Sequence, residues 1–258
     1  MGRIYTFYSP MHGQCKTTAT AIAVAIAEAK KGNDVIITHV QSKMSAMEAY
    51  LGFAEQNKFG AMEDVGLNNL VYNIEGRELT ERDIKAAVIK ISDHLYMLPA
   101  LGQSRGDTEK DAIISNLITT QLPKYYRSVF VDLGIETGEK NAIGRERPMI
   151  KTITEAAAVN YVTLAQSGWL WKKYPFPNVK YLITGYDEDS KYTTFRFRFK
   201  VGAPAIAIPD CTEYADALSD GKIKEFIERH ENINIKKGKS KVEKFFKSVE
   251  GVVKHGSN

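Results

Sequence analysis

A short segment near the start of the chain carries the residues of a phosphate-binding loop. An apolar run over residues 4–8 leads through a turn into Lys16 and Thr17, and an alanine-rich stretch follows. In such loops, backbone N–H groups and the amino end of the next helix hold phosphate oxygens, while the lysine reaches the β- and γ-phosphates and the hydroxyl binds Mg²⁺. The segment therefore predicts a site for a nucleotide and its magnesium ion.

This loop departs from the usual glycine pattern at two positions. Pro10 replaces the first glycine, and Cys15 replaces the glycine before the lysine. A thiol at the start of a helix can be a reactive group, but the simpler interpretation is that a small residue substitutes for glycine. The residues expected to surround the phosphates are Gly13, Gln14, Cys15, Lys16, Thr17 and Thr18.

The elements that position this loop alternate along the chain. Short apolar runs predict strands over residues 4–8, 34–40, 70–73, 93–99, 128–132, 161–165, 180–184 and 203–208. Helical patterns cover residues 17–31, 44–51, 81–91, 107–121, 150–158, 214–218 and 222–230. Strands that alternate with helices predict an α/β fold, with a doubly wound, mostly parallel sheet flanked by helices.

Two further segments complete a pattern that is similar to a known family. Asp132 ends a buried strand, and Pro209 precedes a short helical stretch that ends in glycine. Together with the loop, these segments resemble the deviant Walker A P-loop ATPases of the MinD/ParA family, including its pilus-assembly branch, TadZ. The resemblance implies ATP or ADP as ligand, Mg²⁺ held near Thr17 and Asp132, and an adenine pocket bordered by Pro209.

The sequence also lacks residues that the family uses. Met11 stands where a signature lysine reaches across an ATP-bridged dimer, His39 and Gln41 stand where an Asp-x-Asp pattern orients water and Mg²⁺, and Thr184 with Gly185 replaces an adenine-reading asparagine. Phosphoryl transfer depends on positioned charges. Three outcomes follow: nucleotide binding with weak or no hydrolysis, a nucleotide-free relic of the fold, or competent hydrolysis. We expect the first outcome, nucleotide binding with weak or no hydrolysis.

The segment from Phe195 to Lys200 alternates aromatic and cationic residues. Strict alternation predicts a strand with the aromatic rings on one face, and an amphipathic edge strand is the simpler interpretation. Interleaved rings and cations can also bind single-stranded nucleic acid. We therefore keep nucleic acid as a less favoured partner.

The end of the chain predicts an amphipathic helix. Residues 233–258 form a basic linker and a helix, after a P-loop NTPase-like domain over residues 1–232. Phe245 and Phe246 lie on its apolar face, while Lys244 and Lys247 lie mostly outside it. Such a helix can lie in a membrane interface, and its placement resembles the membrane-targeting tail of MinD. The alternatives are packing on the domain's own surface and docking to a protein partner.

The composition indicates the cellular compartment in which we expect the protein. The chain has 258 residues, a formal net charge of +4 and two cysteines, which fit a reducing cytosol rather than a disulfide framework. We expect no signal peptide or membrane span, and a cytoplasmic protein that reaches the inner face of the membrane if its tail binds lipid.

Two classes of function fit these features. One is a nucleotide-switched positioning or assembly factor that dimerises and acts on a partner protein of unknown identity. The other is a non-catalytic scaffold that keeps the fold and its partner surface but no longer binds nucleotide.

Overall fold

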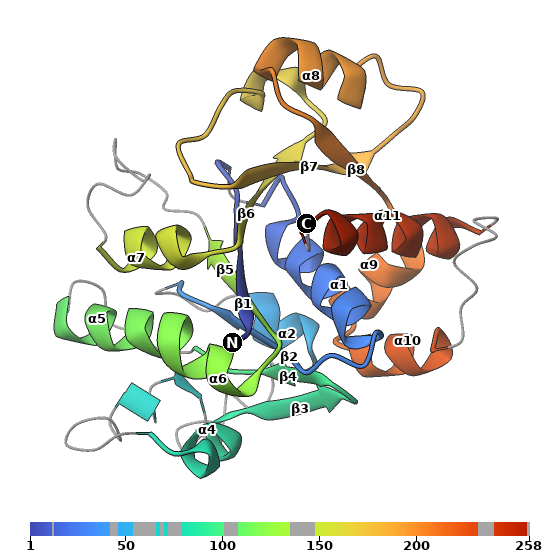
Figure 1. Ribbon diagram of the computed structural model, residues 1–258. Coiled ribbons are helices and arrows are strands. Elements are labelled where there is room, and N and C mark those ends of the chain that lie inside the picture. The colour runs from blue at the N-terminus through green and yellow to red at the C-terminus, as the bar shows by residue number, and fades with distance from the viewer. Residues whose placement is uncertain are drawn as a thin grey trace.

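The computed structural model describes residues 1–11, 13–41, 46–53, 66–67, 70–71, 79–100, 108–134, 148–231 and 240–256. Its centre is an eight-stranded sheet in the order β3-β4-β2-β5-β1-β6-β7-β8 (Figure 1). The strands are β1 (Arg3–Tyr8), β2 (Val35–His39), β3 (Ile89–Ser92), β4 (Leu95–Met97), β5 (Ser128–Gly134), β6 (Val159–Ala165), β7 (Val179–Tyr186) and β8 (Ala205–Pro209). All neighbours run parallel except β3 against β4. This confirms the predicted doubly wound, mostly parallel sheet.

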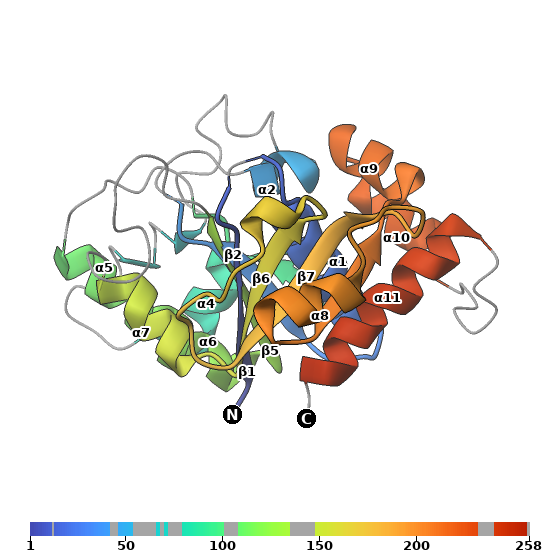
Figure 2. The ribbon, with the colours of Figure 1, turned by 90° about the horizontal axis from the view of Figure 1, so that it is seen from above.

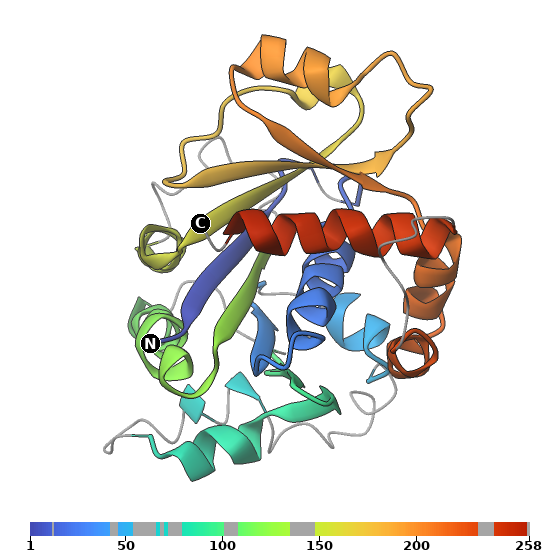
Figure 3. The same cartoon turned by 45° about the vertical axis from the view of Figure 1, so that its right-hand side comes forward.

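Helices cover both faces of the sheet, as the views from above and from the side show (Figures 2 and 3). One layer holds α4 (Glu81–Ala87), α5 (Thr108–Asn116), the π-helix η2 (Leu117–Gln121), α6 (Leu122–Tyr125), α7 (Pro148–Ala156), the 3₁₀ turn η3 (Gly168–Leu170) and α8 (Thr194–Val201). The other holds α1 (Thr17–Ala29), α2 (Ala46–Tyr50), α9 (Thr212–Ser219), α10 (Ile223–Arg229) and α11 (Lys241–Gly256). Each layer forms its own apolar core against the sheet.

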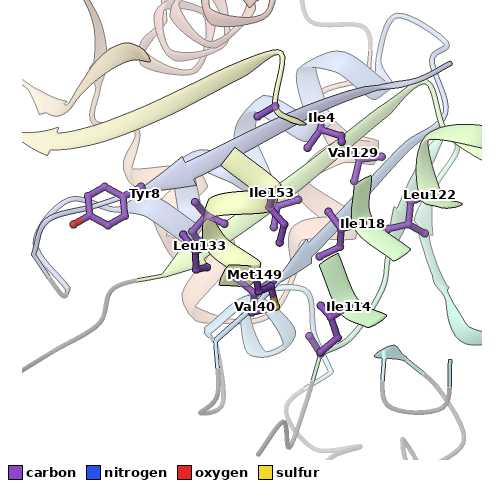
Figure 4. Packing of buried hydrophobic residues seen from close by; sticks show 14 of the residues in the cluster. Ile4, Tyr8, Val40, Ile114, Ile118, Leu122, Val129, Leu133, Met149 and Ile153 are labelled. Carbon is purple, nitrogen blue, oxygen red and sulfur yellow. The ribbon is translucent and has the colours of Figure 1, made fainter. Parts of the chain in front are cut away.

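The core on the α5–α7 side shows how the strands are fixed. Ile4 and Val129 of the central strands face Ile118 and Ile153 from the helices, and all four are buried (Figure 4). Parallel strands that are covered on both faces need apolar residues in nearly every position, as the fully buried run of β5 shows. The central strands are therefore rigid supports for the loops at their ends.

The last helix, α11, belongs to the core on the opposite side. Phe245, Phe246, Val249, Val252 and Val253 are buried against the rest of the domain. The two phenylalanines expected to face a membrane or a partner therefore face α1, α9 and α10 instead, while Lys244 and Lys247 are exposed. Packing on the domain's own surface, one of the three alternatives, is the arrangement found.

The composition of α1 explains this packing. Every residue of α1 from Thr20 to Ala29 is buried, because the helix has almost no polar face to turn toward water. The sheet covers one side of α1, and α11 lies along another side (Figures 1 and 3). No helix among the described residues is long and apolar enough to cross a bilayer.

Three local predictions were wrong. The helix predicted over residues 81–91 ends at Ala87 and gives way to β3. Leu70 and Val71 are helical rather than extended, and the rest of that predicted strand lies outside the described residues. The alternating segment is helix α8 rather than a strand, because Thr193 caps its amino end through the Arg196 N–H and Gly202 ends it in the left-handed region at φ 71°.

Candidate functional site

The predicted phosphate loop lies where the sequence placed it, after the carboxyl end of β1. This strand sits between β5 and β6 at the centre of the sheet, where parallel α/β sheets form their ligand crevices. Thr184 at the end of β7 donates a hydrogen bond to the Cys15 carbonyl at 3.0 Å. Cys15 is buried and Gly13 is exposed with φ 72°. The loop is thus anchored to the sheet at Cys15 and open to solvent at Gly13.

Lys16 does not face into the loop. It caps α1 in the left-handed conformation, with φ 48°, and its ammonium group forms an ion pair with the Asp210 carboxylate after β8. About half of the Lys16 side chain is exposed. The lysine is therefore at the predicted edge of the sheet, but its charge is directed to a carboxylate of the same chain.

The hydroxyl groups of the two threonines after Lys16 make different contacts. Thr18 donates to Asp132 Oδ2 at 2.5 Å. Thr17 instead contacts Thr163 Oγ1 at 2.8 Å, and Thr163 donates its own proton to the Tyr8 carbonyl. Thr17 must therefore donate to Thr163, which leaves the lone pairs of Thr17 available to a cation. The hydroxyl that contacts Asp132 directly is that of Thr18, and the assignment of Thr17 and Asp132 to Mg²⁺ stays a prediction.

Asp132 is fully buried at the end of β5. Burial raises the pKa of its carboxyl group above the ordinary value, while hydrogen bonds from Thr18 and the Gly134 N–H lower it in part. A divalent cation nearby favours the ionised form of a carboxylate. Within the described residues, no group of three His, Cys, Asp or Glu side chains is arranged to hold a metal. Any Mg²⁺ here would thus rely on Thr17, Asp132 and ligand oxygens.

A cavity of about 180 Å³ adjoins the loop. Its lining includes Lys16 and Thr20 at the start of α1, Thr184 and Gly185 of β7, and Pro209 of β8. The remaining lining residues include Tyr50, Ile208, Asp210, Cys211, Tyr214, Leu218 and Phe245. The cavity is mostly apolar and lies beside the phosphate loop, which suits a flat heterocyclic base. Pro209, which the resemblance places beside an adenine pocket, lines this cavity, and its role toward a base stays a prediction.

Helices α1, α2, α9 and α11, which lie in the same layer, contribute to the wall of this cavity. Tyr214 of α9 donates to the Ala19 carbonyl at 2.6 Å, and its ring lies 4.9 Å from that of Phe245. Phe245 is thus a structural residue of the cavity wall rather than a surface residue. The packing of α11 and the shape of the cavity depend on each other.

A buried histidine and glutamate occupy the positions beside Asp132. His39 pairs with Asp132 in the β2–β5 register, and its Nε2 lies 2.8 Å from Glu48 Oε1 with both side chains fully buried. His39 Nδ1 accepts the Gln41 N–H, so Nε2 carries the proton that is donated to Glu48. At the position where the resemblance implies an Asp-x-Asp pattern, this chain thus has the His39 imidazole, which is already hydrogen-bonded to the Glu48 carboxylate.

The other two substituted positions also face this end of the sheet. Met11 packs partly buried against the core. The Gln41 side chain lies against Gly134, where a Cβ would approach Gln41 Cγ to 2.4 Å. Gly134 has φ 65°, so this crowding adds to a backbone conformation that already favours glycine. Neither Met11 nor Gln41 brings a charge to the site.

Three residues of this region were not identified from the sequence: Glu48, Asp210 and Tyr214. Glu48 could have been suspected, because a histidine inside a buried strand needs a hydrogen-bonding partner. Asp210 and Tyr214 follow Pro209 in a segment that was matched only as a whole. Their contacts join residues that are almost 200 positions apart, which no local pattern reveals.

No protein-family model matches the sequence, and no curated protein matches it. Solved structures do match its fold. A ParA family ATPase from Chlorobium tepidum TLS superposes with a TM-score of 0.70 at 16% identity, over 99% of this chain and 100% of that one.

Two further structures agree. The MinC:MinD cell division protein complex of Aquifex aeolicus gives 0.64 at 16% identity, over 98% and 96% of the two chains. A protein from Borrelia burgdorferi B31 described as a plasmid partition protein, bound to AMPPNP, gives 0.65 at 11% identity, over 98% of each chain. This chain therefore has the fold of the MinD/ParA P-loop ATPases.

Proposed function

We propose that this protein is a nucleotide-binding positioning or assembly factor that binds ATP or ADP with Mg²⁺ and acts on a partner protein. The observation that carries the proposal is the convergence of three parts at one edge of the sheet: the phosphate loop, the Thr17–Thr18–Asp132 group and the base-sized cavity. The fold adds support, since a structural neighbour holds AMPPNP.

Different residues would bind the phosphates, the Mg²⁺ ion and the base. Gly13, Gln14 and Cys15 would offer backbone N–H groups to the phosphates, and Lys16 would neutralise them after leaving Asp210. Thr17 and Asp132 would hold Mg²⁺, directly or through water. The bound Mg²⁺ would neutralise phosphate charge. The cavity bordered by Pro209 would receive the base.

Hydrolysis should be slow. The positions beside Asp132 carry a buried His39–Glu48 pair whose hydrogen bond occupies the imidazole, and Met11 and Gln41 are uncharged. Activation of the attacking water and stabilisation of phosphate charge therefore lack groups that the chemistry uses. We expect turnover below about 1 s⁻¹, the low end of ordinary enzymes.

A partner protein completes the proposal. A structural neighbour is the MinD component of a complex with MinC, so the fold can present a surface to a second protein. Membrane contact through Phe245 and Phe246 is not part of the proposal, because both are buried. The exposed residues of α11 are left for solvent or a partner.

The direct test is calorimetric titration of the purified chain with ATP, with and without Mg²⁺. Lys16→Ala should weaken ATP binding by more than about tenfold, since a charge-assisted contact to phosphate is worth at least 1.4 kcal/mol. Thr17→Ala should remove most of the effect of Mg²⁺ on affinity. Lys151→Ala, which removes an exposed lysine of α7, is the matched control. Failure of the wild-type chain to bind ATP or ADP would instead support the nucleotide-free scaffold.

The Lys16–Asp210 ion pair makes a second prediction. Both side chains are at least half exposed, and ion pairs of this kind contribute up to about 1 kcal/mol. Asp210→Asn frees Lys16 and should therefore tighten ATP binding by about two- to fivefold. Asp220→Asn, which breaks the exposed pair with Lys222, should leave affinity unchanged. Weaker binding in Asp210→Asn would show that Asp210 itself contacts the nucleotide or its metal.

A further inference from the structure

Helix α8 presents an aromatic surface that the fold does not use. Phe195 is 68% exposed and Phe199 is 78% exposed. Their rings contact each other edge to face, with centroids 4.9 Å apart. Trp169 of the adjoining turn η3 is also exposed, and Met1 is the one other large hydrophobic residue exposed within the described part of the chain. Exposed large apolar groups gathered in one place mark interaction sites.

The opposite face of α8 holds the helix firmly to the domain. Phe197 and Val201 are buried, and the Phe197 ring contacts Trp171 at 5.2 Å and Tyr181 at 5.1 Å. Because residues two apart lie on roughly opposite sides of a helix, this anchoring turns Phe195 and Phe199 outward. The helix lies at the outer end of the molecule, beyond β7 and β8 (Figures 1 and 3). The two rings can therefore meet a partner without any rearrangement.

Three cations flank the outward-facing rings. Arg196, Arg198 and Lys200 are exposed, and α8 contains no acidic residue. Lys200 donates to the Gly168 carbonyl at 2.5 Å. Within the residues that the structure describes, neither Arg196 nor Arg198 has an ion-pair partner. Arg198 and Lys200 lie in the last turn of α8, and Arg196 lies near its amino end. The last turn is thus positively charged, without a counter-charge on its own helix.

Three acidic residues precede the amino end of the same helix. Asp187, Glu188 and Asp189 are exposed in the loop between β7 and α8. This loop is held in place by Gln166, which accepts the Asp187 N–H at 2.9 Å and donates to the Asp187 carbonyl at 2.8 Å. The neighbouring Lys191 lies over the Tyr192 ring rather than against these acids. Within the described residues, none of the three acids forms an ion pair.

This arrangement is self-complementary, and we propose that α8 is an interface with a second copy of this chain. Two α8 helices packed antiparallel about a two-fold axis would place Phe195 of each copy near Phe199 of the other. The same operation sets Arg198 and Lys200 in the last turn of one α8 against the acids that precede the other. An isologous interface requires this property, that one patch matches itself. The inference goes beyond the proposed nucleotide-dependent function and uses none of the residues of that site.

The acids also decide between a second copy and other occupants. An anionic membrane or a single-stranded nucleic acid that covered this surface would be attracted by Arg196 and Arg198, but it would be repelled by Asp187, Glu188 and Asp189 before the amino end of α8. Only a partner that carries both charges in the reverse order satisfies the whole surface. A second copy carries that arrangement by symmetry. One helix pair is a small interface, so the dimer should be weak, with a dissociation constant in the micromolar range.

The test is sedimentation velocity of the full chain without nucleotide, from about 1 to 200 µM, a range chosen to span micromolar dissociation constants. The wild type should change from monomer to dimer, and Phe195→Ser/Phe199→Ser should weaken the dimer by more than about tenfold. Lys151→Glu/Lys222→Glu, which alters exposed cations on α7 and before α10, should not. Lys16→Ala should also dimerise normally, which separates this interface from any nucleotide-dependent one.

A charge exchange makes the test specific. Variant one is Arg196→Glu/Arg198→Glu, and variant two is Asp187→Lys/Glu188→Lys. Each should be monomeric alone, because like charges then meet, while an equal mixture should form a heterodimer. A wild type that stays monomeric at 200 µM, or a dimer that survives both the phenylalanine and the charge changes, would overturn the proposal. So would a monomer that binds phosphatidylglycerol vesicles or oligo(dT) in a way that Phe195→Ser/Phe199→Ser abolishes.

Discussion

Phe246→Ala is expected to lower the free energy of unfolding by about 3–5 kcal/mol, the usual cost of emptying a phenylalanine site in a core. Phe246 is 1% exposed. Its ring stacks on Phe226 of α10 at 5.8 Å, and the Lys30 ammonium lies 4.7 Å above it. Among the described residues, those around the ring lie in or directly after α1, α10 and α11, and packed helices do not collapse readily into an emptied site. The loss should therefore fall at the upper end of the range.

Urea denaturation followed by circular dichroism measures this loss. Lys244→Ala and Lys247→Ala, on the exposed side of the same helix, are the controls and should stay within about 0.5 kcal/mol of wild type. Deleting everything after Ile235 should have a larger effect, because it uncovers α1, and the truncated chain should lose cooperative unfolding. A truncated domain with wild-type stability would contradict the assignment of α11 to the core, and it would return the helix to the role of a detachable membrane or partner element.

The fold was predictable because its signals are local and repeated. Each central strand is a short apolar run, each connection has helical spacing, and strands that alternate with helices favour parallel pairing. Thr80 caps the amino end of α4 and exchanges hydrogen bonds with Asp83, a local signal of a helix start. The edge of the sheet was less predictable. Strand β3 has four residues and follows α4 after a single residue, so a helical pattern appeared to continue through it.

The wrong prediction at α8 and the choice that stayed open at α11 have physical causes. In α8, strict alternation of rings and cations matches a strand, but eight residues also make two turns of helix, and the caps at Thr193 and Gly202 decide between them. In α11, an amphipathic face shows only that the helix covers something apolar. The evidence for what it covers lies in α1, whose residues leave no side for water. A helix without a polar face predicts a second helix to cover it.

The site was predictable in position but not in its pairings. A loop after a strand and an acid at the end of a neighbouring strand must meet at one edge of a parallel sheet, so Lys16 and Asp132 could be placed together. The ion pair of Lys16 with Asp210 and the buried contact of His39 with Glu48 depend on which side chains converge in space. Those pairings determine whether the site is ready for a nucleotide, and only the structure reveals them.

The His39–Glu48 pair gives the second large effect. Removing one member of a buried, hydrogen-bonded pair leaves the other without a partner and costs about 3–5 kcal/mol. His39→Ala and Glu48→Ala should each lower the free energy of unfolding by this amount. Glu48 also accepts the Ala100 N–H at 3.4 Å, so Glu48→Ala additionally loosens the end of β4. The double variant should lose much less than the sum, because neither partner is then left alone.

The contact between His39 and Glu48 also decides how an aspartate of the Asp-x-Asp pattern could be restored at position 39. His39→Asp alone would place a new carboxylate between Glu48 and Asp132, and Asp132 already has a pKa raised by burial. Three buried acids repel one another most when they are ionised. The variant should therefore be strongly destabilised at pH 7 and regain stability as the pH falls and the carboxyl groups take up protons.

Adding Glu48→Gln to His39→Asp removes one of the three charges and keeps a hydrogen-bonding side chain at position 48. The double variant should regain most of the lost stability at pH 7, and the difference between the two variants should shrink toward pH 4. Urea titrations at several pH values measure both quantities. If the double variant then hydrolyses ATP faster than wild type, the histidine is what slows the chemistry. A single variant His39→Asp that is as stable as wild type at pH 7 would show that Glu48 is not confined as the structure places it, and the explanation of slow hydrolysis through a closed His39–Glu48 pair would fail with it.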